Sequence, residues 1–127
     1  MTNPVTPEDL FKLIGAVPQS GPWGCRGQED RSGIYVVTSD PPKDGQSVVY
    51  IGRAKSVTKR LYQFYRHKFG DRRPHRGGQD ILKLPELGHT LQVYWAYTDN
   101  FEQNERVLIG KFETITGRLP MANKRRG

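Results

Sequence analysis

The stretch from Gly33 to Gly52 constrains the fold of this chain more than any other. It reads GIYVVTSDPPKDGQSVVYIG, two β-branched apolar runs (33–38 and 47–52) around a segment rich in Asp, Pro and Gly. This pattern is typical of two antiparallel strands joined by a loop, here Asp-Pro-Pro-Lys-Asp-Gly. Side chains alternate along a strand, so Tyr35 and Tyr50 share one face if the aliphatic residues share the other (Ile34, Val36, Val49 and Ile51). A register centred on the loop sets the two tyrosines roughly opposite each other, and a one-residue slip would break that pairing.

Length and composition favour a single domain over residues 1–127. Apolar residues make up 35% and aromatic residues 10%, which is polar for a globular chain but outside the disordered range. No apolar run approaches the length of a membrane span, and the N-terminus lacks the layout of a secretory signal. Cys25 is the only cysteine, which excludes an intramolecular disulfide and a cysteine zinc site. We therefore expect a cytoplasmic protein with no membrane partner.

The formal net charge of +7 is concentrated in one part of the chain. Residues 1–52 hold four basic and six acidic side chains, whereas residues 53–77 hold nine basic side chains and one acid, Asp71. Such a block indicates a polyanionic partner, most simply a nucleic acid. The alternative is a solvated basic surface that only improves solubility.

Periodicity places further elements around the hairpin. Residues 1–32 read as an extension, with a helix from Thr6 to Gly15 and then a loop in which Trp23 is an anchor. A helix is expected over 56–68, a basic loop over 69–78, a helical turn over 79–84, a third strand over 91–97 and a long helix over 101–116. The expected apolar stripe of the last helix comprises Leu108, Ile109, Phe112 and Ile115.

Glu105 lies on the apolar side of that long helix, where a carboxylate is out of place unless it is paired, near the helix end, or bound to a cation. The alternative is an acid of the first turns that favours the helix dipole and stays in water. Hydrolysis of a phosphodiester needs an activated water and neutralised phosphate charge, and Mg²⁺ can be held by one carboxylate with the phosphate and waters. Glu105 is the candidate ligand and Arg60 the candidate phosphate-binding residue. A tyrosine can act as a base there only if its pKa is lowered.

Gly33-Ile34-Tyr35 and Tyr50-Ile51-Gly52 together resemble the signature of the GIY-YIG nucleases. Arg60 resembles the arginine on the helix after the second tripeptide, Glu105 the metal-binding glutamate of a later helix, and Asn123 an asparagine near the domain's end. The resemblance implies an α+β fold with a small three-stranded antiparallel sheet flanked by helices. It also implies a catalytic core over 33–123, with 1–32 as an extension and 124–127 as a basic tail.

The resemblance further implies a role for each matched residue. Tyr35 would be the general base, Tyr50 would orient the water or phosphate, Arg60 would bind the scissile phosphate, and Asn123 would brace the site. Glu105 would hold Mg²⁺ or Mn²⁺. The implied activity is a metal-dependent endonuclease that hydrolyses DNA, with a non-catalytic nucleic-acid-binding module of the same fold as the alternative.

One position departs from the family pattern. Many members carry His or Tyr four residues after the arginine, where this chain has Phe64, which has no proton to exchange. His67 lies three residues further along and is a candidate substitute, and His75 resembles a loop histidine of some members; a surface position is the alternative for both. Further basic residues are predicted to contact phosphates, which gives affinity without sequence choice: Arg53, Lys55, Arg72, Arg73, His75 and Arg76. The sequence leaves open the form of the nucleic acid, and whether the protein is a monomer or a homodimer.

Overall fold

The computed structural model describes residues 4–71 and 76–123, which form an α+β fold around one antiparallel sheet. Its strands are β1 (Gln19–Pro22), β2 (Gly33–Lys43), β3 (Gln46–Ala54) and β4 (Thr90–Tyr97), in the order β1-β4-β2-β3. The sheet thus has four strands where three were predicted. No helix in the described ranges has the length and apolar character needed to cross a membrane.

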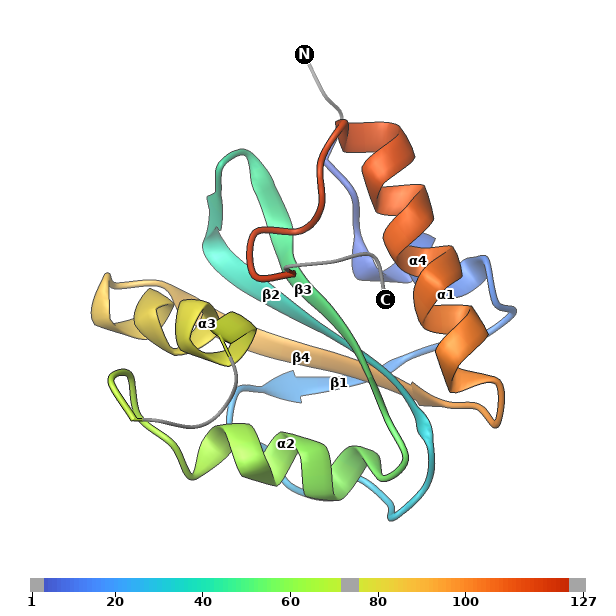
Figure 1. Ribbon diagram of the computed structural model, residues 1–127, viewed down its shortest axis with the longest axis horizontal. Coiled ribbons are helices and arrows are strands. Elements are labelled where there is room, and N and C mark those ends of the chain that lie inside the picture. The colour runs from blue at the N-terminus through green and yellow to red at the C-terminus, as the bar shows by residue number, and fades with distance from the viewer. Residues whose placement is uncertain (1–3, 72–75, 124–127) are drawn as a thin grey trace.

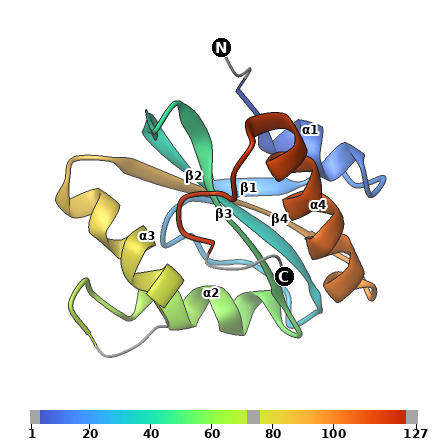
Figure 2. The ribbon, with the colours of Figure 1, turned by 45° about the horizontal axis from the view of Figure 1, so that its top comes forward.

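In the described ranges, four helices cover the sheet, two on each face (Figures 1 and 2). They are α1 (Pro7–Lys12), α2 (Val57–Tyr65), α3 (Arg76–Glu86) and α4 (Phe101–Thr116). On one face, α2 and α3 pack against Tyr35, Val93 and Trp95. On the other, α1 and α4 pack against Ile34, Val36 and Ile51. Side chains that alternate along the hairpin strands therefore contribute to two hydrophobic cores, one on each face of the sheet.

Local signals explain where most helices begin and end. The side chain of Thr6 accepts a hydrogen bond from Asp9 N, and that of Ser56 accepts one from Lys59 N, so both residues cap helices as predicted. Gly117, with φ of 80°, ends α4 in the left-handed conformation that glycine adopts most easily. The bounds predicted for the long helix, 101–116, are confirmed.

The fourth strand comes from the segment 16–32, which was predicted to be a loop. Gln19–Pro22 has little strand propensity of its own and pairs with β4, from Gln19 opposite Trp95 to Pro22 opposite Gln92. Pro22 suits a strand at the sheet edge because it has no N–H to donate. This strand exists because the long strand β4 offers it an edge, a tertiary effect that local sequence does not reveal.

The hairpin is also longer and tighter than predicted. Lys43 pairs with Gln46, so the turn consists of Asp44 and Gly45 alone, with φ of 53° and 83°. Positive φ at both central residues is the geometry that Asp-Gly favours in two-residue hairpins. The prolines at 41 and 42 lie beyond the last pairing of β2 with β4, at Asp40, and within an irregular part of the pairing with β3. They therefore remove few ladder hydrogen bonds.

The predicted register is wrong in detail. Tyr35 pairs with Gly52 and Val37 pairs with Tyr50, so the two tyrosines are diagonal neighbours on one face instead of direct partners. The pairing then shifts by one residue, because Thr38 lies opposite Val48. This irregularity places Val49 in the core on the tyrosine side, whereas simple alternation had placed it with Ile51.

Three helix predictions need smaller corrections. Helix α2 ends at Tyr65, three residues before the predicted end at 68. Helix α3 spans Arg76–Glu86 and keeps Pro85 in its last turn, where the prediction had a shorter helix ended by that proline. Ile115 is 40% exposed, so it does not belong to the apolar stripe predicted for the last helix.

Candidate functional site

At the centre of the candidate site, the rings of Tyr35 and Tyr50 pack together directly above Gly52. The rings of Tyr35 and Tyr50 have centroids 5.9 Å apart. A Cβ at Gly52 would lie 2.4 Å from Cζ of Tyr35 and 2.7 Å from Cε2 of Tyr50, closer than any side chain tolerates. A Cβ at Gly33 would likewise lie 2.3 Å from the carbonyl oxygen of Ala96. The glycines that begin the first tripeptide and end the second are thus required by close packing.

Phe64 on α2 adds a third ring to this group. Its centroid lies 6.1 Å from that of Tyr35 and 6.2 Å from that of Tyr50, both in edge-to-face geometry, and the residue is 1% exposed. Phe64 thus lies on the side of α2 that faces the tyrosines. Phe64 closes one side of the pair with an apolar surface and offers no group that exchanges protons.

The two tyrosine hydroxyls lie close enough for a hydrogen bond between them to influence both pKa values. Burial is the largest influence on both, and it raises the pKa of Tyr35 well above its ordinary value and raises the pKa of Tyr50. Their mutual bond raises the pKa of Tyr35 and lowers that of Tyr50, so Tyr50 accepts the bond in its ionised form. Tyr35 is 1% exposed, while Tyr50 is half-buried. The lowered pKa required of a tyrosine base is not present in the protein alone.

Arg60 lies on α2, close to both tyrosines and to Glu105. Its positive charge lowers the pKa of each of these three groups, although burial outweighs it in every case. The side chain is half-buried, and within the described ranges no hydrogen bond or ion pair engages its guanidinium. An arginine held in this way can offer paired donors to an anion from outside.

Glu105 lies on α4, which packs against β3, and its side chain is close to the two tyrosines and Arg60. The residue is 7% exposed, and its Oε1 lies 3.2 Å from an Nη1 donor of Arg53. Burial raises the pKa of Glu105, and Arg53 opposes that shift. Of the alternatives drawn from sequence, a buried and paired carboxylate is confirmed, and an acid that stays in water is wrong. Arg53, which was predicted to contact phosphate, is the partner of this carboxylate.

Asn123 fixes the main chain of β3 between Tyr50 and Gly52. Its Oδ1 accepts a hydrogen bond from Ile51 N at 2.9 Å, and its Nδ2 donates one to Ile51 O at 2.8 Å. Ala122 N also donates to Val49 O at 2.8 Å. The segment after α4 therefore covers the outer edge of β3 as far as Ile51, a contact visible in Figures 1 and 2. This is the bracing arrangement expected of Asn123.

The other predicted site residues lie elsewhere or outside the described residues. The Nδ1 of His67 lies 3.3 Å from Asp71 Oδ2, so its ring is engaged at the end of α2. Lys55 is exposed just after β3. Arg76 begins α3, but its side chain is outside the described part, as are three further predicted residues: Arg72, Arg73 and His75.

Among the described residues, no group of three or more His, Cys, Asp or Glu side chains could hold a metal ion. In the described part of the chain, Glu105 is the carboxylate whose charge acts on both tyrosines, and the charge of Arg60 acts on it in turn. One carboxylate with phosphate and water oxygens is a donor set that suits Mg²⁺, which keeps several of its waters. The residues present therefore fit a singly anchored hard cation and do not fit a fully protein-enclosed one.

Two other features look like sites but are structural. Ser39 Oγ lies 2.8 Å from His89 Nδ1, as in a nucleophile with its base, but Nδ1 also lies 2.8 Å from the carbonyl oxygen of Pro41. A proton on Nδ1 satisfies both contacts, so this nitrogen holds the loop together and is not a base for Ser39.

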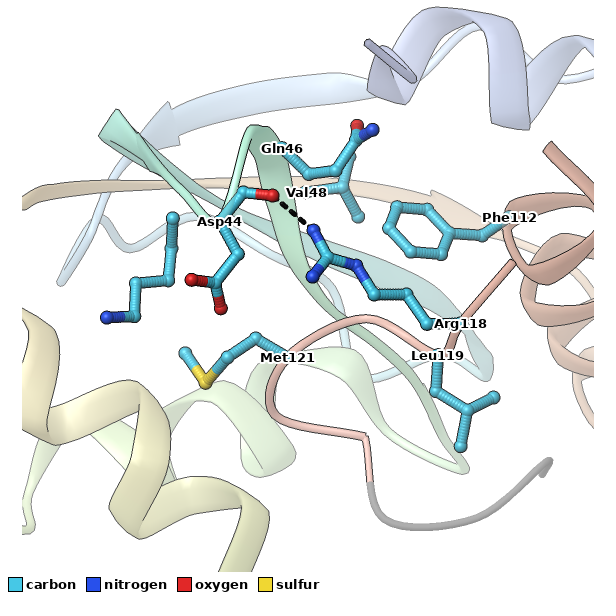
Figure 3. Close-up of a pocket in the computed structure, with 8 residues that line it drawn as sticks. Asp44, Gln46, Val48, Phe112, Arg118, Leu119 and Met121 are labelled. Carbon is cyan, nitrogen blue, oxygen red and sulfur yellow. Dashed lines mark hydrogen bonds between the residues drawn. The ribbon is translucent and has the colours of Figure 1, made fainter. Parts of the chain in front are cut away.

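The second feature is a cavity of about 30 Å³ at the end of the hairpin (Figure 3). It holds about one water molecule and is too small for a substrate. The guanidinium of Arg118 crosses it and donates to the carbonyl of Asp44. That bond ties the segment leading to Asn123 to the hairpin.

No family model, no curated protein and no solved structure matches this chain.

Proposed function

We propose that this protein is a divalent-metal-dependent endonuclease that hydrolyses phosphodiester bonds of DNA in the cytoplasm. The supporting observation is the convergence of Tyr35, Tyr50, Arg60 and Glu105 at one edge of the sheet, with Asn123 fixing the strand between them. The four converging residues come from four separate elements, β2, β3, α2 and α4, and Asn123 comes from the segment after α4. Each belongs to the residue types that phosphodiester hydrolysis uses.

Arg60 is the phosphate-binding residue of this proposal. Its guanidinium has no protein acceptor among the described residues, and its charge already acts on both tyrosine hydroxyls. A phosphate bound there lies beside the hydroxyl pair, and the planar donors of the guanidinium fix its orientation.

Glu105 would hold Mg²⁺ or Mn²⁺, which supplies positive charge that neutralises the phosphate and lowers the pKa of nearby groups. Arg53 keeps this carboxylate in place through Oε1 and leaves its second oxygen, Oε2, outside that ion pair. Because burial raises the pKa of Glu105, the proton competes with the metal at low pH.

The tyrosine pair takes the proton from the attacking water. Tyr50 is the outer member of the pair, and the bond from Tyr35 favours its ionised form. Water from solvent therefore meets Tyr50 first, with Tyr35 as the buried donor behind it. This differs from the expectation that Tyr35 itself is the base.

A second candidate is a module of the same fold that binds nucleic acid without cutting it. The observation in its favour is that burial raises the pKa of both tyrosines while Phe64 stands where an acid–base group was expected. The two candidates share the basic surface and differ in whether a bond is broken.

The deciding experiment is a cleavage assay with labelled plasmid, duplex, single-stranded and branched DNA, and RNA, each with Mg²⁺, Mn²⁺ or EDTA. We expect metal-dependent cutting by the wild type and a loss of at least about 10²-fold with Glu105→Gln. The matched control is Glu102→Gln, which removes the same charge from an exposed position on the same helix. Gel filtration with and without DNA would distinguish a monomer from a homodimer.

Three outcomes have different meanings. Cutting that needs metal and fails only with Glu105→Gln supports the endonuclease. Equal loss in both variants would show that the helix charge, and not a metal ligand, is at work. Binding of the panel with no cutting under any metal would leave the non-catalytic module.

A further inference from the structure

An open groove of about 400 Å³ lies on the outer face of α2, away from the tyrosine pair. It lies between that helix and the segment after β1, and it is lined by Arg26, Thr58, Lys59, Tyr62, Gln63 and Arg66. Three of the six residues are cationic and none is acidic. None of these residues belongs to the candidate catalytic site.

Tyr62 is the aromatic centre of this groove. It is 44% exposed, which is high for a large aromatic side chain on a helix. The guanidinium carbon of Arg26 lies 4.7 Å from the centroid of its ring, and that of Arg66 lies 5.9 Å from it. The ring thus holds two guanidinium groups close together by cation–π attraction, despite their mutual repulsion.

The segment that carries Arg26 is anchored, so the groove is a built feature. Trp23 packs edge-to-face on Tyr65 at 5.0 Å and on Phe64 at 6.2 Å, both on α2. Gln28 is buried, and its Nε2 donates to the carbonyl of Cys25 at 3.3 Å. Arg26 is therefore fixed over α2 from both sides along the chain.

The charges of the groove are available to a ligand. Lys59 is 3.7 Å from Asp30, but this pair is exposed and weak. Within the described ranges, Arg26 and Arg66 form no ion pair. Two unpaired guanidinium groups beside an exposed aromatic ring match the chemistry of a nucleic-acid strand, with phosphates for the arginines and a base or sugar for the ring.

We propose that this groove is a second contact for the sugar–phosphate backbone, separate from the cleavage site. The inference rests on the proposed function, because it assigns a path to the same substrate. Helix α2 carries Arg60 on one side and the groove on the other, so a bound strand crosses the helix, whose diameter with side chains is about 10 Å. The contact adds affinity without sequence choice.

The test is binding of fluorescent 20-nucleotide single-stranded and duplex DNA in EDTA, by anisotropy, over about 50 to 200 mM salt. The double variant Arg26→Gln/Arg66→Gln should weaken binding about 10-fold or more, and lower the slope of log K against log salt by about 1.4 to 1.8. The matched control is Lys12→Gln/Lys111→Gln, which removes two exposed charges from the helices on the opposite face of the sheet.

Tyr62 gives a second readout that does not depend on charge. Tyr62→Ala should weaken single-strand binding at least about 5-fold, while Tyr62→Phe should keep it, because stacking needs only the ring. Thermal unfolding of each variant checks that the exposed substitutions leave the fold intact. Equal losses in the groove variant and the control, or an unchanged salt slope, would overturn the proposal.

The outcome is independent of cleavage, because the binding assay contains no metal. A groove variant that loses affinity in a protein that never cuts would support this contact and refute the endonuclease. A protein that cuts, and whose groove variant binds as the wild type does, would refute this contact and leave the endonuclease standing.

Discussion

Replacing Gly52 by alanine tests whether the two tyrosines are held as the structure places them. The new Cβ would lie 2.4 Å from Cζ and 2.6 Å from Oη of Tyr35, and 2.7 Å from Cε2 of Tyr50. Ordinary contact begins near 3.4 Å, so the rings must move by about 1 Å. Phe64 packs against both rings and restricts where they can go.

Inserting a methyl group into such a packed site costs about 1 to 3 kcal/mol of unfolding free energy. A displacement of about 1 Å at reacting groups can also lower the catalytic rate about 10²-fold. We therefore expect Gly52→Ala to fold with reduced stability and to lose most of its cleavage activity. Urea denaturation measures the first effect and the cleavage panel the second.

Gly110→Ala is the matched control. A Cβ at Gly110 meets nothing within 4 Å, and this position lies on the exposed side of α4. Alanine there should stabilise the protein by about 0.5 to 1 kcal/mol and leave cleavage unchanged. If Gly52→Ala unfolds at the same urea concentration as the wild type and cuts at the same rate, the two tyrosine rings do not pack on Gly52 as described.

Three further substitutions test other parts of the site. Burial raises the pKa of Glu105 in the folded protein, so ionisation of this residue opposes folding. As the pH rises above 4.5, the ordinary pKa, the wild type should therefore lose stability relative to Glu105→Gln, and urea titrations across pH measure the difference. Asn123→Ala removes both bonds to Ile51 and should cost about 1 to 3 kcal/mol in urea denaturation, together with cleavage activity; an unchanged midpoint would contradict the bracing role. His67→Ala should change the cleavage rate by no more than about twofold, since the ring faces Asp71; a loss of about 10²-fold would place it in the mechanism.

The sequence predicted the parts of this fold that local chemistry determines. The long helix with Glu105 on its buried side follows from apolar periodicity and a glycine end, and both bounds were correct. Arg60 and Phe64 share one side of α2, as residues four apart on a helix do, and both lie close to Tyr35. The turn was predicted only as a loop over residues 40–45, although the Asp44-Gly45 pair within it is a typical two-residue hairpin turn.

The remainder depends on contacts between distant residues. Strand β1 forms because β4 pairs with it, and Val49 changes face because the pairing of β2 with β3 shifts by one residue. In the sequence, nothing distinguishes Arg53 from the other basic residues of its block. Its role as the partner of Glu105, 3.2 Å away, follows only from the packing of α4 on the sheet. Register shifts and ion pairs across 52 positions leave no mark in local composition or periodicity.

The bond between Asn123 and Ile51 has a consequence for the order in which the candidate site is completed. The two residues are 72 positions apart, so the ribosome must release Asn123 long after the tyrosine hairpin has emerged. Until then the outer edge of β3 is not covered by the segment after α4, and Ile51 N and Ile51 O lack their hydrogen bonds to the side-chain amide of Asn123. A chain in which this bond has not yet formed can therefore hold its tyrosines, Arg60 and Glu105 without a braced β3, so the proposed cleavage would begin only after the last described segment is in place.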